Sequence, residues 1–251
     1  MKKMVWMGLV MAAVGVAQAG VIFHDDFTTD DGSWLGDGDL TVSGGAASSS
    51  ADGDQSFLKY FTPQTLAVGD SIELTWEAKV TSWGATQNLG RLGLINSKGT
   101  KITGDTAYED AALSNDTGYG FFVNDLRDNS SPWASYVFAK RTVANKVLVA
   151  TSSFGMILAT VSDTYSTMGT GTWTPTQTIR MTRTATGWDL YTVMGGVEGK
   201  ETFPAMTQTA TSIVDASPET TFDGVFFWFN SGAPSGDVSS IRNVTLTVTS
   251  K

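Results

Sequence analysis

The stretch Thr221-Phe-Asp-Gly-Val-Phe-Phe-Trp-Phe-Asn230 decides the fold class, because as a β-strand it would be apolar on both faces. Successive side chains of a strand point to opposite faces, so Phe227 lies on one face while Phe226 and Trp228 lie on the other. In a two-sheet sandwich one face of a strand fills the core, and a second apolar face requires a covering layer or a ligand groove. The stretch therefore predicts a β-sandwich that carries either a further layer or an aromatic binding surface.

Other segments alternate strictly between apolar and polar side chains. In Ser71-Ile-Glu-Leu-Thr-Trp-Glu-Ala-Lys-Val80 the alternation runs throughout, and in Ile241-Arg-Asn-Val-Thr-Leu-Thr-Val-Thr249 it begins at Val244. This pattern is typical of a strand with one face in a core. Further strands are expected at 21–27, 57–61, 89–95, 119–124, 135–139, 177–184 and 188–193. The side chains expected in the core are Ile72, Leu74, Trp76, Ile179, Val244 and Leu246.

The scarcity of helical segments predicts an antiparallel all-β architecture. Parallel strands need long crossover connections, usually helices, and the sequence offers a single short candidate at 106–113. We therefore expect one antiparallel β-sandwich domain over residues 20–251. Two tandem domains of immunoglobulin size are the alternative.

The N-terminus has the parts of a secretory signal peptide. Two lysines precede an apolar run from Met4 to Ala17, and the small residues Ala17 and Ala19 fit a signal peptidase site. We expect residues 1–19 to be removed and the mature chain to be secreted, periplasmic or held at the cell surface. A membrane anchor is the alternative, but about 14 apolar residues are short for a bilayer span. After cleavage no membrane span is expected.

The composition argues against several classes of partner. The chain has 16 basic and 25 acidic residues, and removal of Lys2 and Lys3 leaves a mature formal charge of −11. Binding to nucleic acid or to anionic membranes depends on clustered Lys and Arg, so neither partner is expected. The chain has no cysteine, which excludes disulfides and thiolate metal sites.

Four segments carry a family pattern: Phe23-His-Asp-Asp-Phe27, Val68-Gly-Asp-Ser-Ile-Glu-Leu74, the Arg183–Leu190 hairpin, and Phe222-Asp-Gly-Val225 ahead of a closing Val-Thr-Leu-Thr-Val strand. Together they resemble the concanavalin A-like jelly-roll superfamily, in particular the LamG-like domains of secreted bacterial proteins. The resemblance implies a two-sheet jelly roll whose first and last strands pair and whose curved sheet presents a concave sugar-binding face. Lectins, carbohydrate-binding modules, glycoside hydrolases and polysaccharide lyases share this fold, so it leaves the function open.

Glu73 and Glu77 are the candidates for hydrolysis. Similar jelly-roll glycosidases resembling laminarinases place Glu-x-Asp-x-Glu on one strand, with the first Glu as nucleophile and the second as acid/base, whereas Thr75 stands at the middle position here. Four residues of straight strand separate Cα atoms by about 13 Å, and retaining chemistry needs carboxyl groups about 5 Å apart. We therefore expect a non-catalytic protein. A polysaccharide-degrading hydrolase or a lyase is the alternative, and the residue types that suit a lyase are supplied by Tyr119, Asn124, Arg127, Tyr136 and Lys140.

Asp25 and Asp26 are the candidate metal ligands. Ca²⁺ prefers hard oxygen ligands, and pairs of aspartates recur on short segments in this part of the chain. The resemblance adds that related jelly rolls often tie down their terminal strands with one Ca²⁺ ion, which favours this pair for a structural Ca²⁺. The alternative for the aspartate pairs as a group is tight turns without a metal, because Asp-Gly is a strong turn signal.

Aromatic and polar side chains together predict a glycan-binding surface. Sugars present apolar C–H faces that stack on aromatic rings, and their hydroxyl groups bind Asn, Asp and Arg. We expect a secreted, non-catalytic protein that binds a polysaccharide or other glycan. The alternative is a structural or protein-interaction module of the cell surface whose aromatic residues are core. The candidate sugar-binding residues are Trp83, Asn124, Asp125, Arg127, Trp133, Tyr136, Phe226 and Trp228.

Overall fold

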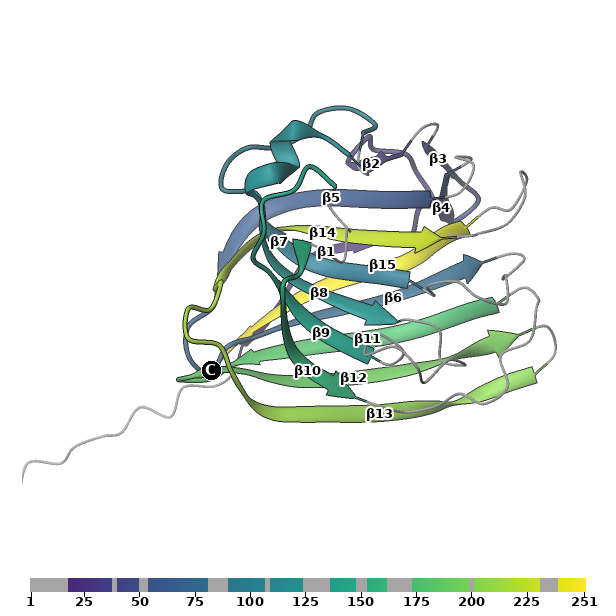
Figure 1. Cartoon of the computed structure of the whole chain (residues 1–251). Coiled ribbons are helices and arrows are strands. Elements are labelled where there is room, and N and C mark those ends of the chain that lie inside the picture. Colours follow the sequence, from purple (N-terminus) through teal and green to yellow (C-terminus); the bar gives the residue numbers. More distant parts are fainter. Residues whose placement is uncertain are drawn as a thin grey trace, which may run out of the picture.

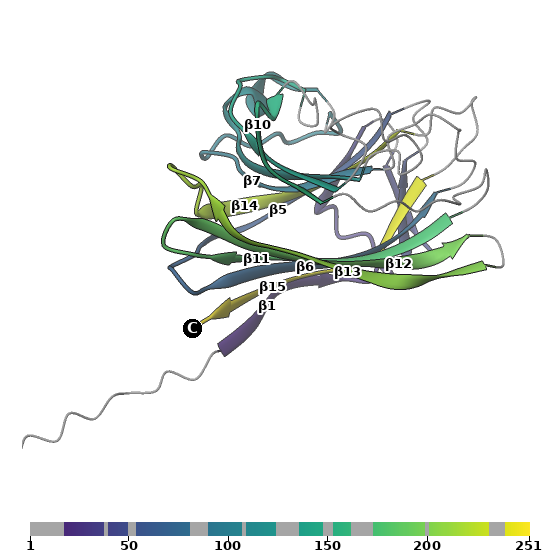
Figure 2. The same cartoon turned by 60° about the horizontal axis from the view of Figure 1, so that its bottom comes forward.

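The protein folds as two antiparallel sheets packed face to face (Figures 1 and 2). The computed structural model describes residues 18–37, 40–49, 54–80, 90–106, 109–123, 136–147, 153–161, 173–198, 201–230 and 239–251. Within these ranges the helical structure is a short 3₁₀ helix, η1 (Ala111–Asn115). The described part of the chain has no helix long and apolar enough to cross a membrane. The predicted all-β, two-sheet architecture is confirmed.

One sheet has eight strands and contains both terminal strands. These are β1 (Gln18–Asp25), β3 (Leu40–Ser43), β4 (Ala46–Ser49), β6 (Ser71–Val80), β11 (Trp173–Arg183), β12 (Gly187–Glu198), β13 (Glu201–Val214) and β15 (Ser239–Ser250). The order is β13-β12-β11-β6-β15-β4-β3, and β1 also pairs with β15. The first described strand thus pairs antiparallel with the last, as the resemblance implied.

The other sheet has seven strands and contains the doubly apolar stretch. Its strands are β2 (Trp34–Gly36), β5 (Asp54–Thr65), β7 (Gly90–Asn96), β8 (Thr117–Val123), β9 (Tyr136–Arg141), β10 (Met156–Val161) and β14 (Thr221–Asn230). The order is β10-β9-β8-β7-β14-β5-β2. The doubly apolar β14 therefore lies inside the sheet, between β7 and β5. Both of its apolar faces need to be shielded from water there.

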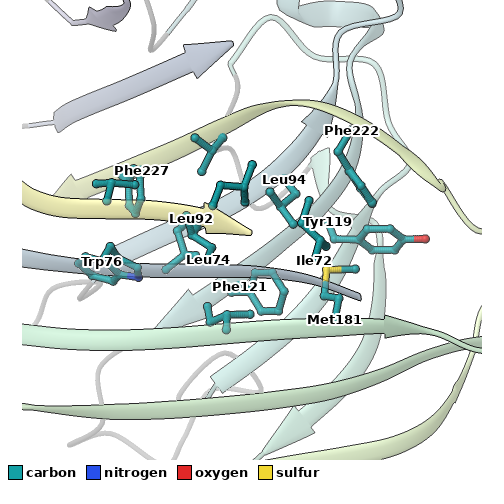
Figure 3. Packing of buried hydrophobic residues seen from close by; sticks show 14 of the residues in the cluster. Ile72, Leu74, Trp76, Leu92, Leu94, Tyr119, Phe121, Met181, Phe222 and Phe227 are labelled. Carbon is teal, nitrogen blue, oxygen red and sulfur yellow. The ribbon is translucent and has the colours of Figure 1, made fainter. Parts of the chain in front are cut away.

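The main core fills the space between the two sheets. In Figure 3, Trp76 of β6 lies near Phe227 of β14, Leu74 near Leu92 of β7, and Ile72 near Tyr119 of β8. Burial of each such side chain stabilises the fold by roughly 1.5–3 kcal/mol. The six side chains predicted for the core are all buried, with at most 3% of any one exposed.

Candidate functional site

The outer face of the seven-stranded sheet is apolar, and a layer of chain covers it. Phe226 and Trp228 are 1% and 2% exposed, and they belong to a second buried cluster that includes Ile102, Leu113 and Phe154. In Figures 1 and 2, η1 and the chain around it lie over this sheet. The covering layer, called the cover from here on, consists of residues 97–106, 109–116, 142–147 and 153–155.

The cover corrects the prediction that Phe226 and Trp228 line an exposed sugar-binding face. The Phe154 ring of the cover lies 4.9 Å from the Phe122 ring and 6.4 Å from the Phe226 ring, between centroids. Gly93 lies opposite Phe226 in the ladder, and a Cβ there would approach the Phe226 ring to 2.4 Å. The second apolar face of β14 thus packs as a core and does not bind ligands from solvent.

Arg91 occupies the end of this apolar face, next to the strand ends. It lies opposite Trp228 in the ladder, with its guanidinium carbon 4.1 Å from the Trp228 ring centroid and 5.6 Å from that of Phe122. A cation over an indole is attracted by the negative face of the ring. One face of the Trp228 indole is therefore used inside the protein.

Two buried polar groups fasten the cover to the sheet. The Asp223 carboxylate of β14 accepts hydrogen bonds from the amide and the hydroxyl of Ser97 at 2.8 and 2.6 Å. The Arg141 guanidinium of β9 donates to the carbonyl oxygens of Asp116 at 3.0 Å and Leu113 at 2.9 Å. Because such bonds satisfy backbone groups that are cut off from water, they hold the covering loops in one place.

Asp116, at the end of η1, is a buried carboxylate of a different kind. It is 4% exposed, and neither carboxylate oxygen has a hydrogen-bond partner within the described ranges. Burial raises the pKa of Asp116 to about 7, while Arg141 acts to lower it and Asp223 to raise it further. Ionisation of this carboxyl group therefore works against the closed position of the cover.

Asp25 and Asp26 have partners from the protein itself. The Asp25 carboxylate accepts hydrogen bonds from Lys59 Nζ at 3.2 Å and from the Trp34 indole at 2.6 Å. Asp26 accepts from the amide and the hydroxyl of Thr28 at 3.0 and 2.8 Å, which forms a local turn. In the described part of the chain, no group of three or more His, Cys, Asp and Glu side chains could hold a metal ion. The pair does not fit the predicted Ca²⁺ site, because the Lys59 ammonium stands where a cation would bind Asp25.

Glu73 and Glu77 point outward from the eight-stranded sheet and have separate partners. Glu73 lies 3.6 Å from the Arg180 guanidinium, and Glu77 accepts a hydrogen bond from the Asn243 side chain at 3.0 Å. About a third of the Glu73 side chain is exposed, 36%. A retaining pair needs one carboxyl protonated and the other ionised, which requires two different local environments. An open strand face provides little to distinguish the two.

Tyr119 and Lys140, two of the five candidates for lyase chemistry, belong to a buried network. The Tyr119 hydroxyl donates to Asp215 at 2.7 Å, and Lys140 Nζ donates to the other Asp215 oxygen at 2.8 Å. Burial, with the Asp215 bond, raises the pKa of Tyr119 above its usual value. Burial alone would also raise the pKa of Asp215, but the bonds from Lys140 and Tyr119 outweigh it and lower that pKa. Fully buried Tyr119 is therefore a structural residue. The sequence signal for this network was Lys140 directly after the apolar run Val137-Phe-Ala139 of β9.

Three described residues at one end of the seven-stranded sheet flank the segments that contain the remaining sugar-binding candidates. Val123, the last residue of β8, pairs with Gly90 of β7 on one side and with Tyr136 of β9 on the other. Gly90 directly follows segment 81–89, and Val123 and Tyr136 directly flank segment 124–135. These three residues lie in one row across the sheet. Trp83, Asn124, Asp125, Arg127, Trp133 and the side chain of Tyr136 lie outside the described residues.

Solved structures with a similar fold include lectins and a lectin-like protein. A seed lectin of Lotus tetragonolobus is similar with a TM-score of 0.56 and 16% identity, over 91% of this chain and 99% of that lectin. Peanut lectin has a TM-score of 0.54 and 12% identity, over 94% and 100%. Arcelin-5, a lectin-like defence protein of Phaseolus vulgaris, has a TM-score of 0.55 and 8% identity, over 94% and 99%. No protein-family model and no curated protein sequence matches the chain.

Identities this low show a shared fold, and the shared fold extends over nearly the whole length of both chains. The features found independently in the structure agree with it: two antiparallel sheets and terminal strands that pair. The chain therefore has the concanavalin A-like jelly-roll fold of the superfamily that its sequence resembles.

Proposed function

We propose that the protein binds glycans at the end of the seven-stranded sheet where β7, β8 and β9 meet, and that it does so without catalysis. The observation that carries the proposal is the row formed by Gly90, Val123 and Tyr136. It anchors two segments rich in sugar-binding residue types to neighbouring strands, on a fold shared with lectins. Trp83 belongs to one segment, and Asn124 to Trp133 form most of the other.

The closed outer face of the sheet supports this location. Phe226 and Trp228 are covered, so a sugar ring has no access to the aromatic residues in the middle of the sheet. Trp83 and Trp133 supply rings for stacking, and Asn124, Asp125 and Arg127 supply groups that bind hydroxyls. The site is thus proposed beside the apolar face and beyond its last residue, Arg91.

A glycan array probed with the mature protein tests this proposal. A glycan that binds should lose affinity by about tenfold or more in Trp133→Ala, because loss of one stacked ring costs on the order of 1–3 kcal/mol. Val68→Ala is the matched control, since Val68 is 61% exposed in the turn between β5 and β6 at the opposite end. Failure to bind any neutral or acidic glycan, or binding unchanged in both Trp83→Ala and Trp133→Ala, would remove the site. A repeat in EDTA tests for Ca²⁺ in the binding site.

We also propose that the protein is exported and that its signal peptide is cleaved after Ala19. In the structure Gln18 and Ala19 pair with Ser250 and Thr249, so cleavage would remove the first two residues of β1 and leave Gly20 opposite Val248. The six remaining residues of the strand keep the pairing that holds the terminal strands together. Intact-mass analysis of secreted protein should give a chain that begins at Gly20, and a chain that retains Met1 would contradict the proposal.

Non-catalytic action is tested separately with β-glucans and galactans. Because Glu73 and Glu77 have different partners on an open face, Glu73→Gln should leave the affinity of the site at the ends of β7, β8 and β9 nearly unchanged, and no reducing ends should form. Reducing ends that appear with the wild type and vanish in Glu73→Gln would show a hydrolase instead.

A further inference from the structure

The outer face of the eight-stranded sheet is open and rich in hydroxyl groups. Figure 2 shows no described element against this side of the sheet, and the outward hydroxyl-bearing side chains in its middle are half-buried or exposed. We call this surface the threonine face. Its hydroxyl-bearing residues are Ser71, Thr75, Thr176, Thr178, Thr182, Thr207, Thr209, Thr245, Thr247 and Thr249.

The hydroxyl groups form rows across the strands. Thr245 of β15 lies opposite Thr75 of β6, which lies opposite Thr178 of β11. The Thr75 and Thr178 hydroxyl oxygens are 3.1 Å apart and hydrogen-bonded. Through Val193 of β12 the same row reaches Thr207 of β13. Neighbouring strands are about 4.7–4.9 Å apart, so the row repeats at that spacing.

The neighbouring row adds a ring and an internal ion pair. Glu73 lies opposite Arg180, and Arg180 lies opposite Tyr191. The Arg180 guanidinium approaches Glu73 to 3.6 Å and stands 4.6 Å from the Tyr191 ring centroid. Tyr191 is half-buried, so part of its phenol remains at the surface.

The threonine face is close to electrically neutral. Three carboxylates, Glu73, Glu77 and Asp189, stand against three cations, Lys79, Arg180 and Arg242, whereas the whole chain has a formal charge of −9. A neutral partner therefore meets little electrostatic repulsion on this face. An anionic polymer would be repelled by the net negative charge of the whole chain. The charge balance and the hydroxyl rows favour the same kind of occupant, a neutral polymer that itself carries hydroxyl groups.

We propose that the threonine face is a second carbohydrate surface and that it binds an extended neutral polysaccharide laid across the strands. It is separate from the site proposed at the ends of β7, β8 and β9, which we call the strand-end site. Each threonine hydroxyl can donate and accept a hydrogen bond, as a sugar hydroxyl can, and each threonine methyl offers apolar contact to a ring C–H. An extended chain of pyranose rings advances by a length per ring similar to the spacing between strands. One sugar ring can therefore face one strand along a row.

Retention on insoluble neutral polysaccharides tests the proposal, with cellulose, chitin and insoluble β-1,3-glucan as probes and alginate as the anionic comparison. The triple variant Thr75→Val, Thr178→Val and Thr245→Val keeps the branched shape and strand preference of these residues while it removes their hydroxyls. We expect retention on at least one neutral polymer to weaken roughly tenfold, because each net hydrogen bond changes affinity by a few-fold. The control variant carries Thr62→Val, Thr100→Val and Thr142→Val, exposed threonines outside this face.

The test separates this surface from the strand-end site. Loss of polymer retention in the face variant, with soluble-glycan binding and unfolding temperature unchanged, would support the proposal. Equal retention by the face variant and the wild type, equal loss in the control variant, or no retention on any neutral polymer would overturn it. Thr75→Ser, Thr178→Ser and Thr245→Ser provide a rescue, because serine restores the hydroxyl, and retention should return.

Discussion

The two outer faces of the sandwich differ in what their sequences require. The outer face of the seven-stranded sheet carries Phe122, Phe226 and Trp228, and the cover buries them. The outer face of the eight-stranded sheet carries mainly threonine with a few paired charges, and no described element lies against it. Exposure of an apolar surface of this size to water would cost free energy. The hydroxyl group of a threonine on a strand, by contrast, can form hydrogen bonds with water. The residues of the outward face thus decide whether a sheet of this fold receives a further layer.

Aromatic residues have different surroundings on the two outer faces. On the covered face the rings contact each other in edge-on and tilted arrangements and Arg91 lies over Trp228, with no access from solvent. On the open face Tyr191 stacks on Arg180 and keeps part of its surface in water. An aromatic residue in this fold can therefore be assigned a binding role only after the face on which it lies is known.

Truncation of a ring should have its largest effect on the covered face. Trp228→Ala should lower the free energy of unfolding by about 3–5 kcal/mol, because it removes a buried indole and leaves a cavity. Tyr191→Ala on the open face should cost about 1 kcal/mol or less. Denaturant unfolding of both variants measures the difference, and equal losses would show that the two faces are not packed differently.

The buried network at Asp215 should make stability sensitive to acid. The pKa of Asp215 is lowered in the folded protein, so its contribution is present above its ordinary value near pH 4 and is lost as the pH falls through the folded value. Asp215→Asn leaves the Lys140 ammonium without its carboxylate and should cost about 3 kcal/mol at pH 7. Unfolding followed between pH 2 and pH 7 should show a smaller acid loss in this variant. A wild-type profile and a variant profile that run parallel would contradict the assignment.

Asp116 beneath the cover should show the opposite pH dependence. Its folded pKa of about 7 lies above the ordinary value of 3.8, so the stability it contributes is full below about pH 4 and is lost as the pH rises toward 7. Asp116→Asn should therefore be more stable than the wild type at pH 8, by about 1–3 kcal/mol, and should lose this advantage near pH 4. Asp30→Asn, on an exposed turn, is the control. A gain that is the same at pH 4 and pH 8 would rule out ionisation as the cause.

The smallest effect is expected for charges on the open face. Glu73→Gln removes one side of a largely exposed ion pair and should change the free energy of unfolding by less than about 0.5 kcal/mol. Thermal unfolding at low and high salt measures it. A loss of several kcal/mol would mean that the threonine face is buried in solution, for instance against a second molecule.

The sequence predicted those features that depend on local pattern. The alternation in β6 and β15 fixed which side chains enter the core, and Ile72, Leu74 and Leu246 lie there. The double apolarity of β14 showed that a covering layer or a groove was needed. It could not decide between them, because Ile102 and Phe154 of the cover lie far from β14 in sequence and have no pattern of their own.

Some of the site predictions concern residues whose partners are distant in the chain. Asp25 and Asp26 have the residue types of a Ca²⁺ site, but Lys59, which binds Asp25, lies on another strand and its proximity requires the fold. For the same reason Tyr119 was open to an interpretation as a base until its contact with Asp215 was seen. Side-chain chemistry read from sequence therefore identifies candidates, and tertiary pairing decides which of them are free to act.

Hydroxyl-radical footprinting of the native protein, read by mass spectrometry, tests the contrast between the two faces most directly. Trp and Tyr react readily when solvent reaches them, so the modification of each ring reports its exposure. We predict that Phe226 and Trp228 are protected until the protein unfolds, while Tyr191 on the threonine face is modified in the native state. Rapid modification of Trp228 in the folded protein would contradict the covered face and restore β14 as an exposed sugar-binding surface.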